Sequence, residues 1–145
     1  MKSQLNQLAV GFVWCAAASC LLANDNAKGK EPLRVSHGAE VTISELAVPG
    51  KYTVFDFYSD YCPPCRALKP ELERIHAQRD DVALVVVDIN RPNVRGIDWK
   101  SPVAKQYNLH SIPHLVIYDP SGKVLAEDKD HQPDARQYIQ EHWSD

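Results

Sequence analysis

The sequence predicts a single α/β domain with a central mixed β-sheet flanked by helices. Two continuous apolar runs, at 52–58 and 82–88, have the composition of buried strands, and a segment with helical periodicity lies between them. The chain has 145 residues, of which 44% are hydrophobic and 24% are charged, and it contains no internal repeat. This composition is that of an ordinary globular protein, and the length supports one hydrophobic core.

The first half of the domain is predicted to form a strand, a helix and a second strand. Residues 52–58 (YTVFDFY) are aromatic and β-branched, and Asp56 is the one charge inside the run. The helix is predicted over 63–79, because two prolines suit its first turn and apolar residues then recur every three or four positions. Residues 82–88 (VALVVVD) then complete a right-handed crossover between parallel strands.

The second half is predicted to form a short helix, two strands and a closing helix. A polar segment leads into the short helix at 103–107, and 114–119 has the composition of a third strand. A turn at 120–123 (PSGK) separates it from a fourth strand at 124–127. Residues 134–143 have their apolar side chains at the spacing of one helix face, which predicts packing against the sheet.

The N-terminal region is predicted to direct export. Residues 8–23 carry no charge, and the run is shorter than the roughly 20 residues of a membrane-spanning helix. The residues that follow are polar and have no apolar periodicity. We therefore predict a signal peptide at 1–23, a linker at 24–32 and the folded domain at 33–145.

Three fates of this apolar segment stay open. Cleavage after Ala23 would release the domain from the membrane. The sequence Ala17-Ala18-Ser19-Cys20 resembles a bacterial lipobox, in which the cysteine is lipidated, and one acyl chain would tether the domain weakly. An uncleaved segment would act as an anchor. Each fate predicts a periplasmic or cell-envelope domain, which contacts the membrane only if the N-terminal segment is retained or lipidated.

Cys62 and Cys65 form a CxxC pair where the first strand leads into the helix. Cysteines at this spacing can close a disulfide, and the N–H groups and dipole of a helix N-terminus favour a thiolate on the first cysteine. Cys62 is therefore predicted to be the nucleophile, and Cys65 the thiol that resolves a mixed disulfide. We expect no metal, because zinc needs four ligands and no second CxxC is present. A static disulfide remains the structural alternative.

The segment that contains this pair resembles the active-site segment of the thioredoxin superfamily. Residues 55–65 (FDFYSDYCPPC) carry the likeness, Pro70 matches the helix proline of the family, and Ser111-Ile112-Pro113 matches the segment with its cis-proline. Pro49-Gly50-Lys51 resembles the extracytoplasmic branch related to TlpA. The similarity covers residues 41–143 and implies a thioredoxin-like fold.

The resemblance implies a third catalytic residue, Asp56. In the family a buried acid stands at this position beneath the cysteines, and such a carboxylate would take the proton of Cys65 as it attacks the mixed disulfide. The sequence departs from thioredoxins at Val86, where they carry a lysine that pairs with the acid. We therefore expect Asp56 to be harder to ionise.

The resemblance also implies a substrate-binding surface beside the cysteines. Ile112 would offer its backbone to the substrate polypeptide, Pro113 would be cis, and Tyr61 and Pro63 would flank the nucleophile. Residues 93–100 (NVRGIDWK) resemble an insertion relative to thioredoxin and are a candidate wall of the substrate groove.

The sequence also gives expectations for Trp99 and for the histidines. Trp99 is either an anchor for a partner or a plug on the core, and we favour the plug. His114 is either a groove-wall residue or a group that tunes the thiolate. The other histidines are predicted to be solvated: His37, His76, His110, His131 and His142.

Together these residues predict an exported thiol:disulfide oxidoreductase, with no bound cofactor, that reduces disulfides of cell-envelope proteins. Its electrons would come from a membrane-embedded reductase, and we expect a monomer. The formal charge of −3, without a basic block, argues against nucleic acid as a partner.

Two alternatives remain from the sequence. One is an oxidase of the same fold that introduces disulfides, and the other is a non-catalytic binding or assembly module that uses the groove near Ile112 and Pro113. Strong oxidants of this superfamily carry a histidine inside the motif, whereas both intervening residues here are proline, which favours reduction.

Overall fold

The computed structural model describes residues 30–129 and 132–144, so the predicted signal peptide, Cys20, residues 24–29 of the predicted linker and His131 lie outside the described residues. The described chain folds into one six-stranded sheet with the order β1-β3-β2-β4-β5-β6. The strands are β1 (Leu33–Val35), β2 (Tyr52–Tyr58), β3 (Val82–Asp88), β4 (His114–Tyr118), β5 (Val124–Lys129) and β6 (Gln132–Pro133). The helical elements are η1 (Ile43–Leu46), α1 (Pro63–Gln78), α2 (Pro102–Gln106) and α3 (Asp134–His142).

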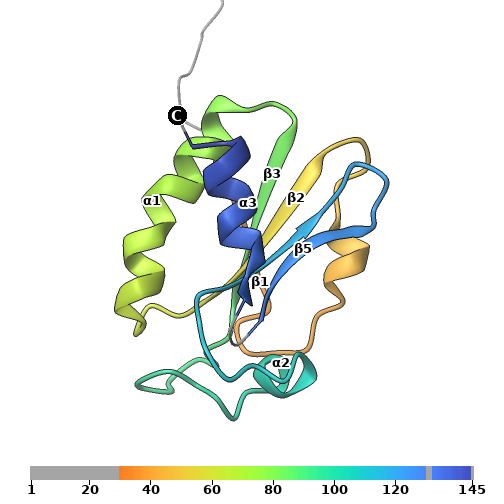
Figure 1. The fold of residues 1–145 in the computed structure, drawn as a ribbon. Helices are drawn as coiled ribbons and strands as arrows, with labels where there is room; N and C mark the ends of the chain where they lie inside the picture. The colour runs from red at the N-terminus through yellow and green to blue at the C-terminus, as the bar shows by residue number, and fades with distance from the viewer. Residues whose placement is uncertain (1–29, 130–131, 145) are drawn as a thin grey trace, which may run out of the picture.

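The predicted α/β class with a mixed sheet is confirmed. Strand β2 lies at the centre, where it pairs in parallel with β3 and antiparallel with β4. Helix α1 connects β2 to β3 and lies along the sheet (Figure 1). All seven residues of β3 are buried, as expected for a strand covered on both faces.

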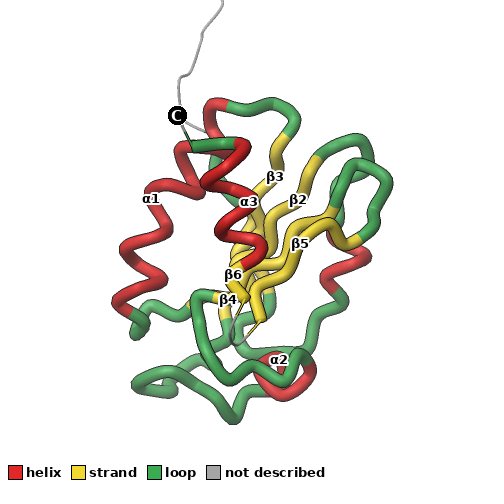
Figure 2. Tube along the Cα trace, in the orientation of Figure 1, coloured by secondary structure: helices red, strands yellow, loops and turns green. Residues whose placement is uncertain are grey.

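Two hydrophobic clusters occupy the two faces of the sheet. Helices α1 and α3 cover one face, and η1 and α2 contribute to the cluster on the other (Figures 1 and 2). Side chains of a strand alternate between faces, so Val54 and Tyr58 point toward α1 and α3 while Phe55 and Phe57 point the other way. Asp56 shares the register of Val54 and Tyr58, and its carboxylate therefore enters the layer beneath α1.

Short elements at both edges of the sheet were not predicted. Strand β1 has three residues and pairs with β3, and β6 has two residues and pairs with β5. Runs this short carry no readable alternation, and their partners in the sheet determine their conformation. Strand β5 extends two residues past its predicted end at Glu127, so Asp128 lies inside it. Within residues 30–129 and 132–144, no helix has the length and apolar character needed to span a bilayer.

Candidate active site

The two cysteines meet at the N-terminus of α1, where they form a disulfide with their Cα atoms 5.3 Å apart. Cys62 caps the helix, and its Sγ accepts a hydrogen bond of 3.2 Å from the backbone N–H of Cys65. Pro63 and Pro64 have no N–H, so this donor is the first that the helix directs at the sulfur. In the reduced pair, the same donor and the helix dipole favour negative charge on Cys62.

The cysteine pair lies just below the protein surface. Cys62 is 1% exposed and Cys65 is fully buried. The two residues that flank Cys62 are exposed: Tyr61 is 50% accessible, and Pro63 opens the helix on the solvent side. Cys62 is therefore flanked at the surface by the two residues that the sequence analysis expected to flank the nucleophile.

Ile112 and Pro113 lie beside the cysteines although they are about 50 residues away in the sequence. The carbonyl oxygen of Ile112 is 3.6 Å from the Sγ of Cys62. The Ile112–Pro113 peptide bond is cis, the isomer that the resemblance implies. Both side chains are half-buried, and that of Ile112 packs against both hydrophobic clusters. The segment thus presents backbone next to the reacting sulfur.

Asp56 is a buried carboxylate in the cysteine layer. It lies opposite Val86 on β3 and Leu115 on β4, and both of these belong to the cluster that contains Cys65. Directly opposed residues share a face of the sheet, so the Asp56 side chain faces the same layer. Asp56 is 1% exposed, and its Oδ1 has no hydrogen-bond partner among the described residues.

The surroundings of Asp56 favour its neutral form. Burial and, to a smaller extent, the nearby carboxylate of Asp128 raise the pKa of Asp56, whereas the Lys69 ammonium on α1 lowers it. The net result is a pKa of about 7. Val86 adds no charge from β3, so the cation that acts on Asp56 comes from the helix. Near neutral pH both forms of the carboxyl are populated, as proton transfer requires.

Asp128 is a residue of this site that the sequence analysis missed. Its carboxylate accepts hydrogen bonds from Arg136 Nε at 2.8 Å and from the first backbone N–H groups of α3, including that of Ala135 at 3.1 Å. These donors satisfy both carboxylate oxygens of a residue that is buried. The predicted strand ended at Glu127, one residue before Asp128, so the alternation that points Asp128 inward was not recognised.

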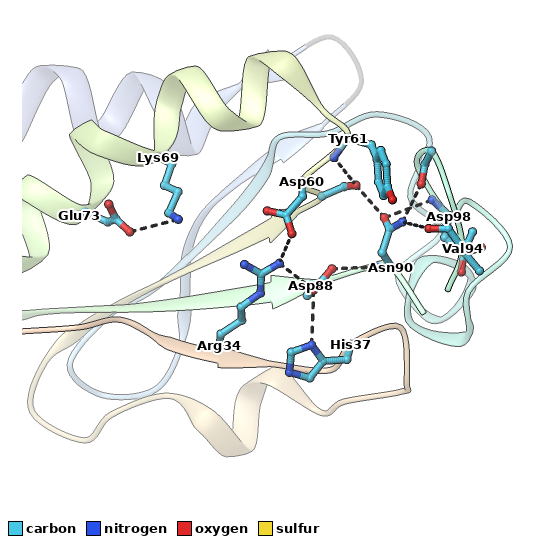
Figure 3. Close-up of polar contacts among 12 residues, drawn as sticks. Arg34, His37, Asp60, Tyr61, Lys69, Glu73, Asp88, Asn90, Val94 and Asp98 are labelled. Atoms are coloured by element: carbon cyan, nitrogen blue, oxygen red, sulfur yellow. Dashed lines mark hydrogen bonds and ion pairs between the residues drawn. The ribbon is translucent and has the colours of Figure 1, made fainter. Parts of the chain in front are cut away.

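A second polar group lies at the edge where β2 and β3 end, next to the loop that leads to Cys62 (Figure 3). Arg34 on β1 bridges two carboxylates, with Nη2 at 3.0 Å from Asp60 Oδ2 and 2.8 Å from Asp88 Oδ2. His37 Nδ1 is 3.4 Å from Asp88. One feature of the sequence could have predicted this group. Asp60 follows the first predicted strand and Asp88 ends the second, and parallel strands end at the same edge of a sheet.

The loop before Cys62 is also bonded to the loop after β3. The buried Ser59 hydroxyl donates a hydrogen bond of 2.7 Å to the side-chain oxygen of Asn90 and accepts one of 3.2 Å from the backbone N–H of Tyr61 (Figure 3). The N–H of Asn90 in turn bonds to Asp88 at 3.0 Å. Hydrogen bonds therefore connect the backbone of Tyr61, next to Cys62, to Asn90 in the segment that precedes the insertion.

Two predictions about single side chains are wrong. Trp99 is 40% exposed, so it does not plug the core. His76 is buried, and its Nδ1 lies 3.0 Å from the carbonyl oxygen of Val82, which anchors α1 to β3. His114 is half-buried, 3.4 Å from Glu127 and edge-on to Phe57. Of the residues that the model describes, no group of three or more His, Cys, Asp or Glu could hold a metal ion.

Comparisons with known proteins agree with this geometry. The sequence model of the family named Thioredoxin matches residues 40–141. A protein named thiol:disulfide interchange protein TxlA homolog, from Synechocystis sp., is 32% identical over 87 residues, which cover 58% of this chain and 44% of that protein. The thioredoxin of Mycoplasmoides gallisepticum is 30% identical over 82 residues, which cover 57% of this chain and 73% of that protein.

Solved structures share the fold. Thioredoxin f2 of Chlamydomonas reinhardtii superposes with a TM-score of 0.54 at 23% identity, over 79% of this chain and 99% of that one. The match to the TxlA homolog covers 44% of its length, and a match to mitochondrial thioredoxin-2 of Schizosaccharomyces pombe covers 45% of that protein. The chain therefore spans less than half the length of these two relatives.

Proposed function

Because the chain belongs to the thioredoxin family, we propose that this protein is an exported reductase of protein disulfides in the cell envelope, from the TlpA-related branch. Residues 40–141 form a thioredoxin-type thiol–disulfide oxidoreductase domain. One observation carries the proposal: a CxxC disulfide at a helix N-terminus shares its buried layer with a carboxyl whose pKa is about 7. A static disulfide requires no such proton acceptor.

The first step of the proposed reaction is attack by the Cys62 thiolate on a substrate disulfide. A bond forms between Cys62 Sγ and one substrate sulfur, and the substrate S–S bond breaks. The other substrate sulfur leaves as a thiolate and takes a proton from water. The N–H of Cys65 and the helix dipole stabilise the attacking thiolate, and the backbone at Ile112 lies where the substrate chain would bind.

The second step releases the substrate. Asp56 accepts the proton of the Cys65 thiol, and the resulting thiolate attacks Cys62 Sγ. The Cys62–Cys65 disulfide forms, the bond between Cys62 Sγ and the substrate breaks, and the second substrate sulfur leaves as a thiolate that takes up the proton held by Asp56. The substrate has then gained two electrons from the protein and two protons, one from water and one that came from Cys65. A dithiol donor must return the electrons, and we assign this role to a membrane-embedded reductase.

The direction of electron flow is tested by the reduction potential of the Cys62–Cys65 couple. The full chain is equilibrated with defined ratios of reduced to oxidised dithiothreitol, and the thiol fraction is measured. We expect a value near that of thioredoxin, about −270 mV. A value near −120 mV would make the protein an oxidase, and a pair that resists reduction well below about −300 mV would be structural.

The export proposal is supported by the uncharged run at 8–23 and is tested separately. Mass spectrometry of the mature N-terminus in a bacterial host distinguishes cleavage after Ala23 from lipidation at Cys20. An intact Met1 in the membrane fraction would contradict both forms of processing, and an intact Met1 in the cytosol would contradict export.

A further inference from the structure

The insertion at 93–100 follows β3 and is held by hydrogen bonds from two residues that precede it, Asn90 and Arg91. Asn90 Nδ2 donates to the carbonyl oxygens of Gly96 at 2.6 Å and Val94 at 3.4 Å, and its Oδ1 lies 3.4 Å from the backbone N of Asp98 (Figure 3). Arg91 makes a two-point contact with Asp98, with Nε at 2.7 Å and Nη2 at 3.0 Å from its two oxygens. These bonds hold the end of the loop in one position.

Trp99 follows directly after this bonded segment and is held at the surface. The backbone N of Trp99 bonds to the carbonyl oxygen of Ile97 at 3.1 Å, and Ser101 bonds back to Asp98 at 3.1 Å and caps α2. Trp99 is 40% exposed, so part of its indole is accessible at the surface on a backbone that is hydrogen-bonded on both sides.

Trp99 forms one wall of a groove of about 380 Å³, which lies at the lower end of the range of about 300 to 1,000 Å³ usual for binding pockets. The buried side chains of Ala104 and Leu109 contribute an apolar floor. His110 also lines the groove and precedes Ile112 by two residues, so their Cα atoms are at most about 7 Å apart. His110 thus connects the groove, along the chain, to the segment that holds the Ile112 carbonyl near Cys62.

The one charged side chain among the described residues that line the groove is Lys105, which is positive although the whole chain carries a formal charge of −3. Lys100 follows Trp99 and is exposed, and none of the described lining residues is acidic. The acidic residue nearest in sequence, Asp98, is paired with Arg91. The groove thus favours a partner segment that combines an apolar side chain with carboxylates.

We propose that this groove docks an acidic, apolar-containing segment of the protein whose disulfide Cys62 attacks. The proposal rests on the function proposed above and adds the class of substrate. A large apolar side chain of the substrate lies against Trp99 and Leu109, and its acidic neighbours face Lys105 and Lys100. Aromatic anchors and matched charges of this kind set which partner is bound and how fast it associates.

The test uses synthetic peptides with one cysteine held as a mixed disulfide with thionitrobenzoate. One peptide carries a leucine and two aspartates near the cysteine, and its twin carries lysines in place of the aspartates. The reduced full chain attacks the mixed disulfide, releases coloured thionitrobenzoate, and then frees the peptide thiol as Cys62–Cys65 closes. Each rate is divided by the rate of the same protein with the mixed disulfide of free cysteine, which has no segment to dock.

We expect the acidic peptide to react at least tenfold faster than its twin at low salt, as a rate relative to free cysteine. Lys105→Glu should reduce this preference below about twofold, and Trp99→Ala should lower the relative rate of the acidic peptide about tenfold. The matched controls are Lys123→Glu and Leu125→Ala, which change exposed residues outside the groove and should keep the wild-type preference.

The docking proposal is overturned if the two peptides react equally with the wild-type chain, or if the groove variants behave like the controls. The proposed function fails in a different way, namely if the reduced chain leaves the free-cysteine disulfide unreacted. If the reduced chain does not react, docking is measured without redox chemistry. The acidic peptide is added with its cysteine replaced by serine, and the change in tryptophan fluorescence is followed. A titration in wild type that Lys105→Glu weakens at least fivefold would support docking, and no titration would refute it.

Discussion

Asp56 and Asp98 are both aspartates with almost no solvent exposure, at 1% and 4%, and the protein uses them in opposite ways. Asp56 lies in the apolar layer beneath α1, and its Oδ1 has no hydrogen-bond partner among the described residues. Asp98 lies in the polar loop after β3, and Arg91 contacts both of its oxygens. Burial raises the pKa of Asp56, whereas hydrogen bonds from Arg91 lower the pKa of Asp98.

The difference shows that the partners of a carboxylate, more than its exposure, decide what it can do. A carboxylate satisfied by a guanidinium keeps its charge, and it contributes to loop order without exchanging protons. A carboxyl without a partner for Oδ1 gains and loses a proton near neutral pH, at some cost in stability. The reactive region is therefore the apolar one, and the polar loop beside it is the structural one.

The largest expected effect is the loss of reaction when Cys62 is replaced. Cys62→Ser should lower the rate of disulfide reduction by more than about a thousandfold, because no thiolate remains to attack. The matched variant Cys65→Ser keeps the nucleophile, so it should still attack and then accumulate the mixed disulfide, visible by mass spectrometry. Equal activity of Cys62→Ser and wild type would place the chemistry outside this region.

The second effect is on the step that Asp56 is proposed to assist. Asp56→Asn should slow resolution of the mixed disulfide about a hundredfold at pH 7.5, the usual size of a general-base contribution. In wild type the rate of this step should rise with pH through about 7, following the pKa of Asp56. The rates are measured by stopped flow across pH. A variant that keeps both the wild-type rate and its pH profile would contradict the proton-transfer role.

The third effect concerns stability, and its sign follows from the direction of the pKa shift. The folded pKa of Asp56, about 7, lies above that of an unfolded aspartate. The contribution of the protonated Asp56 carboxyl to the free energy of unfolding is thus fully present below about pH 4, and it is lost as the pH rises to about 7. Asp56→Asn should therefore be more stable than wild type above pH 7, by up to about 4 kcal/mol, with the difference vanishing near pH 4. Urea denaturation of the oxidised chain at several pH values measures this difference.

The smallest effect is expected for a substitution of Asp98 in the loop after β3. Its effect on stability should depend on pH in the opposite direction to that of Asp56→Asn. The pKa of Asp98 is lowered, so its stabilisation is present above the unfolded pKa and is lost as pH falls through the folded value. Asp98→Asn should lower the melting temperature by about 2 to 5 °C at pH 7. Near pH 2 the two melting curves should converge. A variant at Asp98 that gained stability at neutral pH would remove the contrast with Asp56.

Local patterns in the sequence were sufficient to predict the central part of the fold and the central part of the site. The runs at 52–58 and 82–88 and the helix that starts at Pro63 form as expected, and Cys62 and Cys65 lie together at its N-terminus. These elements are predictable because burial on both faces and helical periodicity are recorded in consecutive residues. The spacing of the CxxC pair was likewise enough to predict a disulfide.

The tertiary structure alone decided how distant residues surround this pair. It brings Asp128 and Lys69 within electrostatic reach of Asp56 and leaves Trp99 at the rim of a groove, whereas the position of Ile112 beside Cys62 was already implied by the family resemblance. The sequence could not show these relations, because they depend on strand pairing and on the packing of α1 and α3 against the sheet. Periodicity reports whether a side chain is buried, and only the fold determines which charges, donors or partners it meets there.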